Sequence, residues 1–109
     1  MPKRDADLLL EDIRSALSRV ERYIAGMSKE QFLVDEKTID AVVRNLEILG
    51  EAVRWLPGEF KALRQEIPWN QIAGMRNRIV HDYFGLDLEI IWQVLQTSLP
   101  DFKSQLEQR

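Results

Sequence analysis

The strongest constraint on the fold is a seam of apolar residues in the middle of the chain. Its successive members are alternately three and four residues apart. They are Ile39, Val42, Leu46, Leu49, Val53 and Leu56. This spacing keeps one side of an α-helix apolar for about five turns, which is typical of a helix that packs lengthwise against its neighbours. Pro57 and Gly58 follow and end the helix. The sequence therefore predicts an all-α protein with this segment as the central packing helix.

Three further long amphipathic helices are expected, one before the central helix and two after it. Apolar residues recur in each at helical spacing, and acidic residues or proline stand where helices commonly begin. The signals are Asp5 or Asp7 as N-cap and Gly26 as the end of the first helix, Pro68–Trp69 as the start of the next, and Asp87 as the N-cap of the last. Pro100 is expected to kink or restart the last helix, because proline removes a backbone donor.

Two short helical segments complete the predicted fold. Ser28 and Gln31 have the spacing of a capping box, which predicts a helical turn directly after them. A second short helix is expected over Glu59–Glu66, with Phe60 and Leu63 directed inward. The predicted fold is thus an all-α antiparallel bundle of four main helices with one or two short ones. Burial of large apolar side chains, at ~1.5–3 kcal/mol each before entropy is counted, is sufficient to hold it.

Size and composition narrow the class of protein. The chain has 109 residues, no cysteine and a formal net charge of −3. This length suits one domain, residues 1–109, and the lack of cysteine excludes disulfides and thiolate metal ligands. There is no secretory leader and no apolar run of ~18 residues, so we expect a cytoplasmic protein without membrane contact. Because phosphate contacts dominate nucleic-acid affinity, an acidic chain is expected to bind RNA only through a local basic patch.

The chemically versatile side chains gather in one stretch, residues 75–85. It contains the single histidine of the chain, His81, together with Arg76, Asn77, Arg78 and Tyr83. An imidazole titrates near neutral pH and can transfer protons, whereas a guanidinium stays cationic and binds phosphate oxygens through forked donors. Proton transfer and a phosphate clamp are the minimal requirements for cutting RNA without a metal. One histidine does not easily fill both proton-transfer roles, which favours a two-fold dimer that brings a second copy.

The positions of these residues on a helix restrict how they can act together. Arg76 and His81 are five residues apart, about 140° around an ideal α-helix, whereas Asn77 and Arg78 share the face of His81. Arg76 and His81 are therefore not natural neighbours. Either Arg76 reaches round the helix, or the helix distorts near its end, or the pair is completed across a dimer. Gly85 is a good residue to end a helix, so the helix is expected to fray near His81.

The stretch resembles the Arg-x4-His-x-Tyr signature of the HEPN superfamily, specifically of HepT, the toxin of HepT/MntA toxin–antitoxin systems. Arg76, His81 and Tyr83 occupy the three signature positions, and Asn77 directly follows the arginine. The likeness covers nearly the whole chain. It includes the small all-helical domain, the run from Arg44 to Ala52, Ile67-Pro68-Trp69, and Leu99-Pro100 in the last helix.

The resemblance implies a metal-independent endoribonuclease that works as a homodimer and needs no cofactor, within a type VII-like toxin–antitoxin system. Arg76 and His81 match its catalytic pair, and Asn77 matches a supporting position. Tyr83 matches the tyrosine to which a partner nucleotidyltransferase, MntA, transfers AMP to silence the toxin. Arg78 and Asp82 fall at variable positions and receive no role from the likeness. Arg78 is a candidate RNA contact because of its charge.

Other residues carry weaker signals. Glu47 and Glu51 form an acidic pair one helical turn apart, but the chain lacks the Glu-x-x-His motif of di-metal bundles, so a polar network is favoured over a metal site. Gly50 is expected to allow close approach of a neighbouring helix. Gly74 either makes such a contact or is a point where its helix bends easily. The tryptophans, interpreted as core or interface anchors rather than base-stacking platforms, are Trp55, Trp69 and Trp92.

Two other classes of function remain open beside a ribonuclease. One is a non-catalytic adaptor or substrate-binding partner of a nucleotidyltransferase, with Tyr83 as the AMP acceptor. The other is a structural helical dimerisation module, in which alanine at Arg76, His81 and Tyr83 is tolerated. Cleavage of RNA by the purified protein separates the ribonuclease from both.

Overall fold

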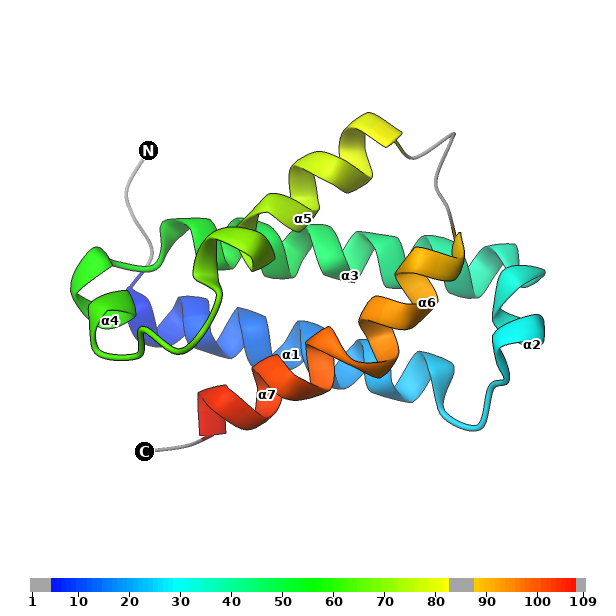
Figure 1. Ribbon diagram of the computed structural model, residues 1–109, viewed down its shortest axis with the longest axis horizontal. Coiled ribbons are helices and arrows are strands. Elements are labelled where there is room, and N and C mark those ends of the chain that lie inside the picture. The colour runs from blue at the N-terminus through cyan, green and yellow to red at the C-terminus, as the bar shows by residue number, and fades with distance from the viewer. Residues whose placement is uncertain (1–4, 83–87, 108–109) are drawn as a thin grey trace.

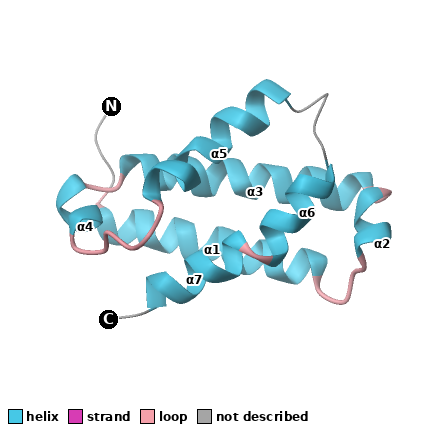
Figure 2. Cartoon of the chain, viewed as in Figure 1, coloured by secondary structure: helices cyan, strands magenta, loops and turns pink. Residues whose placement is uncertain are grey.

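The helices of this protein are defined by a computed structural model. It describes the backbone of residues 5–82 and 88–107, and the side chains of residues 5–75 and 88–107. Within these ranges every regular element is an α-helix (Figure 2), which confirms the predicted class. The helices are α1 (Ala6–Ile24), α2 (Lys29–Leu33), α3 (Glu36–Trp55), α4 (Gly58–Ala62), α5 (Trp69–Asp82), α6 (Leu88–Gln96) and α7 (Ser98–Glu107).

The long helices α1 and α3 form an antiparallel pair that runs along the molecule (Figure 1). Helix α5 packs against α3 and rises away from it toward its own C-terminal end. Helices α6 and α7 follow one another diagonally, and the short helices α2 and α4 lie at opposite ends. This is the predicted antiparallel bundle, with two short helices. In the described part of the chain, none of the helices has the length and apolar character needed to cross a membrane.

The predicted seam of α3 forms the middle of the core. All six of its residues are buried, and Val42, Leu49 and Val53 are completely so. Helix α1 contributes a matching apolar stripe of Leu9, Leu10, Ile13, Ala16, Leu17 and Val20. The two largest fully buried side chains, Phe32 and Phe102, come from α2 and α7. Every described helix except α4 therefore places at least one side chain in the core.

Local side chains cap the first two helices. Of the two candidate caps of α1 the structure selects Asp5, whose Oδ1 accepts from the Asp7 backbone N–H at 2.9 Å. Helix α2 has the predicted capping box. Ser28 Oγ accepts from the Gln31 backbone N–H at 3.1 Å, and Gln31 Oε1 accepts from the Ser28 backbone N–H at 2.9 Å. These bonds satisfy donors that the first turn of a helix leaves free, so they fix where each helix begins.

Asp35 caps α3 and has a perturbed pKa. Its Oδ1 accepts from the Thr38 backbone N–H at 3.0 Å. Hydrogen bonds from the backbone and side chain of Thr38 stabilise the charged form and hold the pKa of Asp35 below its ordinary value. Because the folded-state pKa is lowered, the carboxylate stabilises the fold above the unfolded-state pKa. This effect is lost as the pH falls through the folded-state pKa.

We expect the Asp35→Asn variant to lose less stability on acidification than the natural chain. Asparagine is an equally good N-cap but does not titrate, so it keeps an acceptor for the Thr38 N–H at every pH. Urea unfolding at about pH 6 and again below about pH 3 measures the difference. The matched control is Asp35→Ala, which should already lower the free energy of unfolding at about pH 6. Equal acid losses in Asp35→Asn and the natural chain would contradict this account.

The last expected helix is divided in two at Thr97, whose Oγ1 donates to the Gln93 carbonyl oxygen at 2.8 Å. Pro100 lies in the first turn of α7, where its missing N–H costs no helical hydrogen bond. The predicted restart is thus confirmed, while the N-cap predicted at Asp87 lies outside the described residues.

The short helix expected over Glu59–Glu66 ends early. Helix α4 stops at Ala62 with Leu63 as its C-cap, so Leu63 lies at the end of a helix rather than within the inward-facing side of a longer one. The side chain of Leu63 is 82% exposed, and the prediction of an inward position is wrong. Phe60, by contrast, is partly buried against the core as predicted.

Candidate active site on helix α5

The predicted site residues lie on the second half of α5. The helix contains Arg76, Asn77, Arg78 and His81. Their side chains, and the whole of Tyr83, lie outside the described part of the chain. The backbone therefore places four of the five predicted site residues on one helical segment. The helix is assigned through Asp82, one residue beyond His81, and the residues that follow lie outside the described part of the chain, so the fraying expected near His81 stays a prediction.

The regularity of α5 narrows the ways in which Arg76 and His81 can act together. Because the segment is α-helical through Asp82, a helical distortion does not join them. Five residues of regular helix separate their Cα atoms by about 140° around the axis and ~7.5 Å along it. Two arrangements remain: Arg76 reaches round the helix, or a second copy of the chain completes the pair.

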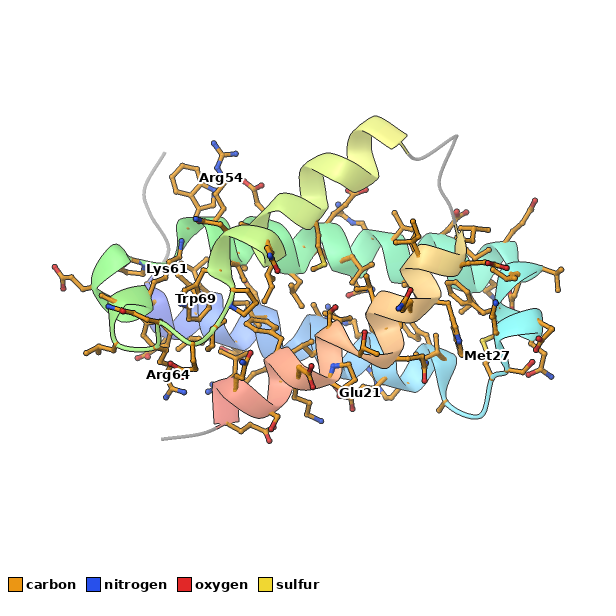
Figure 3. All side chains as sticks on the ribbon, viewed as in Figure 1. Glu21, Met27, Arg54, Lys61, Arg64 and Trp69 are labelled. Carbon is orange, nitrogen blue, oxygen red and sulfur yellow. The ribbon has the colours of Figure 1, made fainter. Side chains whose placement is uncertain are left out.

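Trp69 anchors the start of α5. Its side chain is 8% exposed, and Nε1 donates to the carbonyl oxygens of Lys61 at 3.2 Å and of Arg64 at 3.0 Å. The indole packs edge-on against Phe60 and Phe102, with ring centroids 6.1 and 6.0 Å apart. Figure 3 shows Trp69 inside the α4 end of the bundle. The prediction of a core anchor is confirmed for this tryptophan, which ties α5 to the α4 region and to α7.

Arg64 adds a long-range contact at the same end of the molecule. Its Nη1 donates to the carbonyl oxygens of Gln105 at 3.2 Å and Leu106 at 3.0 Å. These carbonyls belong to the last turn of α7, where helical oxygens lack partners and a cation is favourable. The segment that leads into the motif-bearing helix is therefore held by residues about forty positions away, which no local sequence pattern indicates.

Helix α3, which packs on α5, contains one buried amide. Asn45 is 5% exposed, and its Nδ2 donates to the Ala41 carbonyl oxygen at 2.8 Å. Its Oδ1 has no hydrogen-bond partner among the described atoms. A buried acceptor without a partner costs ~1–3 kcal/mol, so a donor that reached this oxygen would be bound favourably. In the sequence, Asn45 stands out only as a member of the run from Arg44 to Ala52 that resembles the family.

The close contacts predicted for Gly50 and Gly74 have different outcomes. A Cβ built on Gly74 of α5 would meet no described atom within 4 Å, so this glycine does not mark a close helix contact. Gly50 is buried on α3, which packs against both α1 and α5. Its expected role in a close approach stays a prediction.

Glu51 takes part in a polar contact. Its Oε1 accepts from the indole Nε1 of Trp55, one helical turn further on, at 2.8 Å. Across residues 5–75 and 88–107, no group of three His, Cys, Asp or Glu side chains is placed to hold a metal ion. The polar interpretation of this glutamate is therefore supported by a specific hydrogen bond with Trp55.

Fold and motif together define a small all-helical domain that carries Arg-x4-His toward the end of one helix. A family model described as "Ribonuclease HepT-like" matches residues 13–109, so the chain belongs to the HepT-like ribonuclease family of the HEPN superfamily. It is 41% identical over 105 residues to a Thermococcus cleftensis protein named "Probable ribonuclease HepT", covering 96% of each chain.

Two relatives from Methanocaldococcus jannaschii extend the comparison. One, named as a candidate RNase, is 36% identical over 108 residues, which is 99% of this chain and 89% of the relative. The other is named as a gamma-glutamylcyclotransferase and candidate RNase. It is 33% identical over 104 residues, which is 95% of this chain but 47% of the relative. No solved structure matches the chain.

Proposed function

We propose that this protein is a metal-independent endoribonuclease whose active site contains Arg76 and His81. The observation that carries the proposal is that the ribonuclease family match spans the segment of α5 on which Arg-x4-His lies. A proton-transferring imidazole and a permanently charged guanidinium on one helical segment suit the cleavage of a phosphodiester. Asn77 is assigned a supporting role and Arg78, on the same helical face as His81, a contact to RNA phosphate.

In the proposed reaction the ribose 2′-oxygen bonds to the adjacent phosphorus. A base removes the 2′-hydroxyl proton, the bond from phosphorus to the 5′-oxygen of the next nucleotide breaks, and an acid protonates that oxygen. The products are a 2′,3′-cyclic phosphate and a 5′-hydroxyl. His81 serves as the proton-transfer group, and Arg76 stabilises the charge that builds up on the phosphorane oxygens.

The proposal includes a homodimer. The reaction needs a base and an acid, and each chain has a single histidine. A two-fold axis places the same surface of both copies face to face, so the α5 segments of two chains can line one cleft. The regular helix supports this, because it leaves Arg76 and His81 about 140° apart within one copy.

The proposed enzyme is the toxin of a toxin–antitoxin pair, regulated at Tyr83. A partner nucleotidyltransferase related to MntA would join the Tyr83 phenolic oxygen to the α-phosphorus of ATP, with release of pyrophosphate. Tyr83 is two positions beyond His81 in the sequence. A bulky anion added there would repel an RNA phosphate from the Arg76/His81 site.

The test is incubation of the purified protein with single-stranded RNA in excess EDTA. Cleavage is expected, with 2′,3′-cyclic phosphate or its hydrolysis product at the new 3′ ends. The same digestion after treatment with ATP and the partner nucleotidyltransferase should be suppressed, with AMP found on Tyr83 by mass spectrometry.

Two outcomes of this test would replace the proposal. AMP on Tyr83 with no RNA cleavage at any protein concentration would assign the chain as a non-catalytic adaptor. No modification, no cleavage and unchanged growth on expression would leave a structural dimerisation module.

A further inference from the structure

Trp55 is exposed but held in place. It is the last residue of α3 and its side chain is 48% exposed, so of the two roles predicted for the tryptophans, core anchor and interface anchor, the first is excluded. Its Nε1 donates to Glu51 Oε1 at 2.8 Å, and the Arg54 guanidinium carbon lies 5.4 Å from the centre of its ring. A hydrogen bond and a cation–π contact thus fix the indole before any ligand arrives.

One cation, Arg54, lies over this indole, and a second, Lys61, is hydrogen-bonded to the backbone of Arg54. Arg54 is exposed, and the Nζ of Lys61 donates to the Arg54 backbone carbonyl oxygen at 3.4 Å. The cluster of Trp55, Arg54 and Lys61 therefore offers an aromatic surface together with two positive charges, beside the Glu51 carboxylate that accepts from the indole. In an acidic chain, such a local concentration of cations is what binding of a phosphate backbone requires.

The Trp55 cluster lies close enough to α5 for one substrate molecule to contact both. Trp69, the first residue of α5, hydrogen-bonds the Lys61 carbonyl oxygen, which places the cluster beside the start of that helix. Arg54 projects from α3 on the side toward which α5 rises (Figure 3). Helix α5 has 14 residues and is about 20 Å long, a distance that a strand of a few nucleotides can cover.

We propose that the Trp55 cluster is a subsite that stacks an unpaired base of single-stranded RNA, with Arg54 and Lys61 on the adjoining phosphates. The subsite rests on the proposed function in taking RNA as the substrate. RNA is chosen over a protein partner because the family match is to a ribonuclease and the cluster combines one ring face with two cations. Tryptophan and arginine are also enriched at protein interfaces, so a protein partner is kept as an outcome of the test. A nucleic-acid base is compatible with the neighbours of this ring, because stacking needs only one face of the indole and the cations can bind the adjoining phosphate.

The test measures binding without cleavage. His81→Ala serves as the parent, so that the RNA stays intact, and a fluorescently labelled single-stranded oligoadenylate is titrated at fixed salt. Trp55→Ala in this parent should bind about 5- to 150-fold more weakly, the range expected for the loss of one stacked base. Trp55→Phe keeps an aromatic face and should recover most of the affinity. Leu63→Ala, which removes another exposed apolar side chain nearby in the sequence, is the matched control and should bind like the parent.

A second probe identifies what Trp55 recognises. An oligonucleotide of the same length with abasic sites keeps its phosphates but has no bases to stack. It should bind the parent more weakly than oligoadenylate, while Trp55→Ala should bind both almost equally. Arg54→Ala should instead reduce the salt dependence, lowering the slope of log K against log salt by ~0.7 for each phosphate that the variant no longer neutralises.

The outcomes separate this subsite from the nuclease. If Trp55→Ala binds oligoadenylate like the parent, or the parent shows no preference for bases over abasic sites, the subsite is wrong even where the natural chain cleaves RNA. If Trp55-dependent base binding is found but the natural chain does not cleave, the subsite stands and the nuclease proposal falls. A change in the sedimentation of Trp55→Ala without a change in base preference assigns Trp55 to a protein interface and overturns the subsite.

Discussion

Replacing His81 by alanine is expected to lower the rate of RNA cleavage by ~10²–10⁴-fold, the usual contribution of a positioned general acid or base. The reason is that His81 is the single imidazole of the chain, and imidazole is the side chain whose ordinary pKa lies nearest neutral pH. Initial rates on a labelled RNA in EDTA, for the natural chain and His81→Ala at equal concentration, give the ratio.

The control for His81→Ala is a change on the same helix away from the motif. Gln71 is exposed in the first turn of α5, and Gln71→Ala should cleave RNA at the natural rate. Both variants should keep the helical circular dichroism and melting temperature of the natural chain. Retained cleavage in folded His81→Ala would remove this histidine from the mechanism, whereas loss of folding would make the rate uninformative and call for His81→Gln in its place.

Replacing Phe102 by alanine is expected to cost ~3–5 kcal/mol of unfolding free energy, against a total of ~5–15 kcal/mol for a domain of this kind. Phe102 is 1% exposed and meets the Trp69 ring edge-on, at 6.0 Å between centroids and an interplanar angle of 85°. Its loss leaves a cavity under the indole that anchors α5. Urea unfolding should show a lower midpoint with an unchanged m-value.

Leu63→Ala is the matched control for Phe102→Ala. Leu63 is also a large apolar residue, but it is 82% exposed, so its truncation should change stability by no more than ~0.5 kcal/mol. A cost below ~1 kcal/mol for Phe102→Ala would mean that the packing between α7 and Trp69 contributes little to the fold.

Features that depend on neighbouring residues are predicted more accurately from the sequence than features that depend on distant packing. The seam of α3, the capping box at Ser28 and the restart near Pro100 are confirmed, because each depends on residues within one or two helical turns. The inward position predicted for Leu63 is wrong. The apolar spacing of α3 leaves Trp55 off the seam, in agreement with its exposure, whereas the burial of Trp69 and the exposure of Leu63 depend on which distant helix covers them. The roles of Arg76, His81 and Tyr83 stay predictions.

The sequence by itself determined the helical class, the central packing helix and the family to which the chain belongs. Apolar periodicity, caps and a short motif are properties of neighbouring residues, and they act before any tertiary contact forms. Only the tertiary structure decided that the Arg64 guanidinium hydrogen-bonds the last turn of α7 and that the Trp69 indole hydrogen-bonds the Lys61 carbonyl of α4. These features arise from surfaces that meet only when segments far apart in the chain pack together, so no local pattern encodes them.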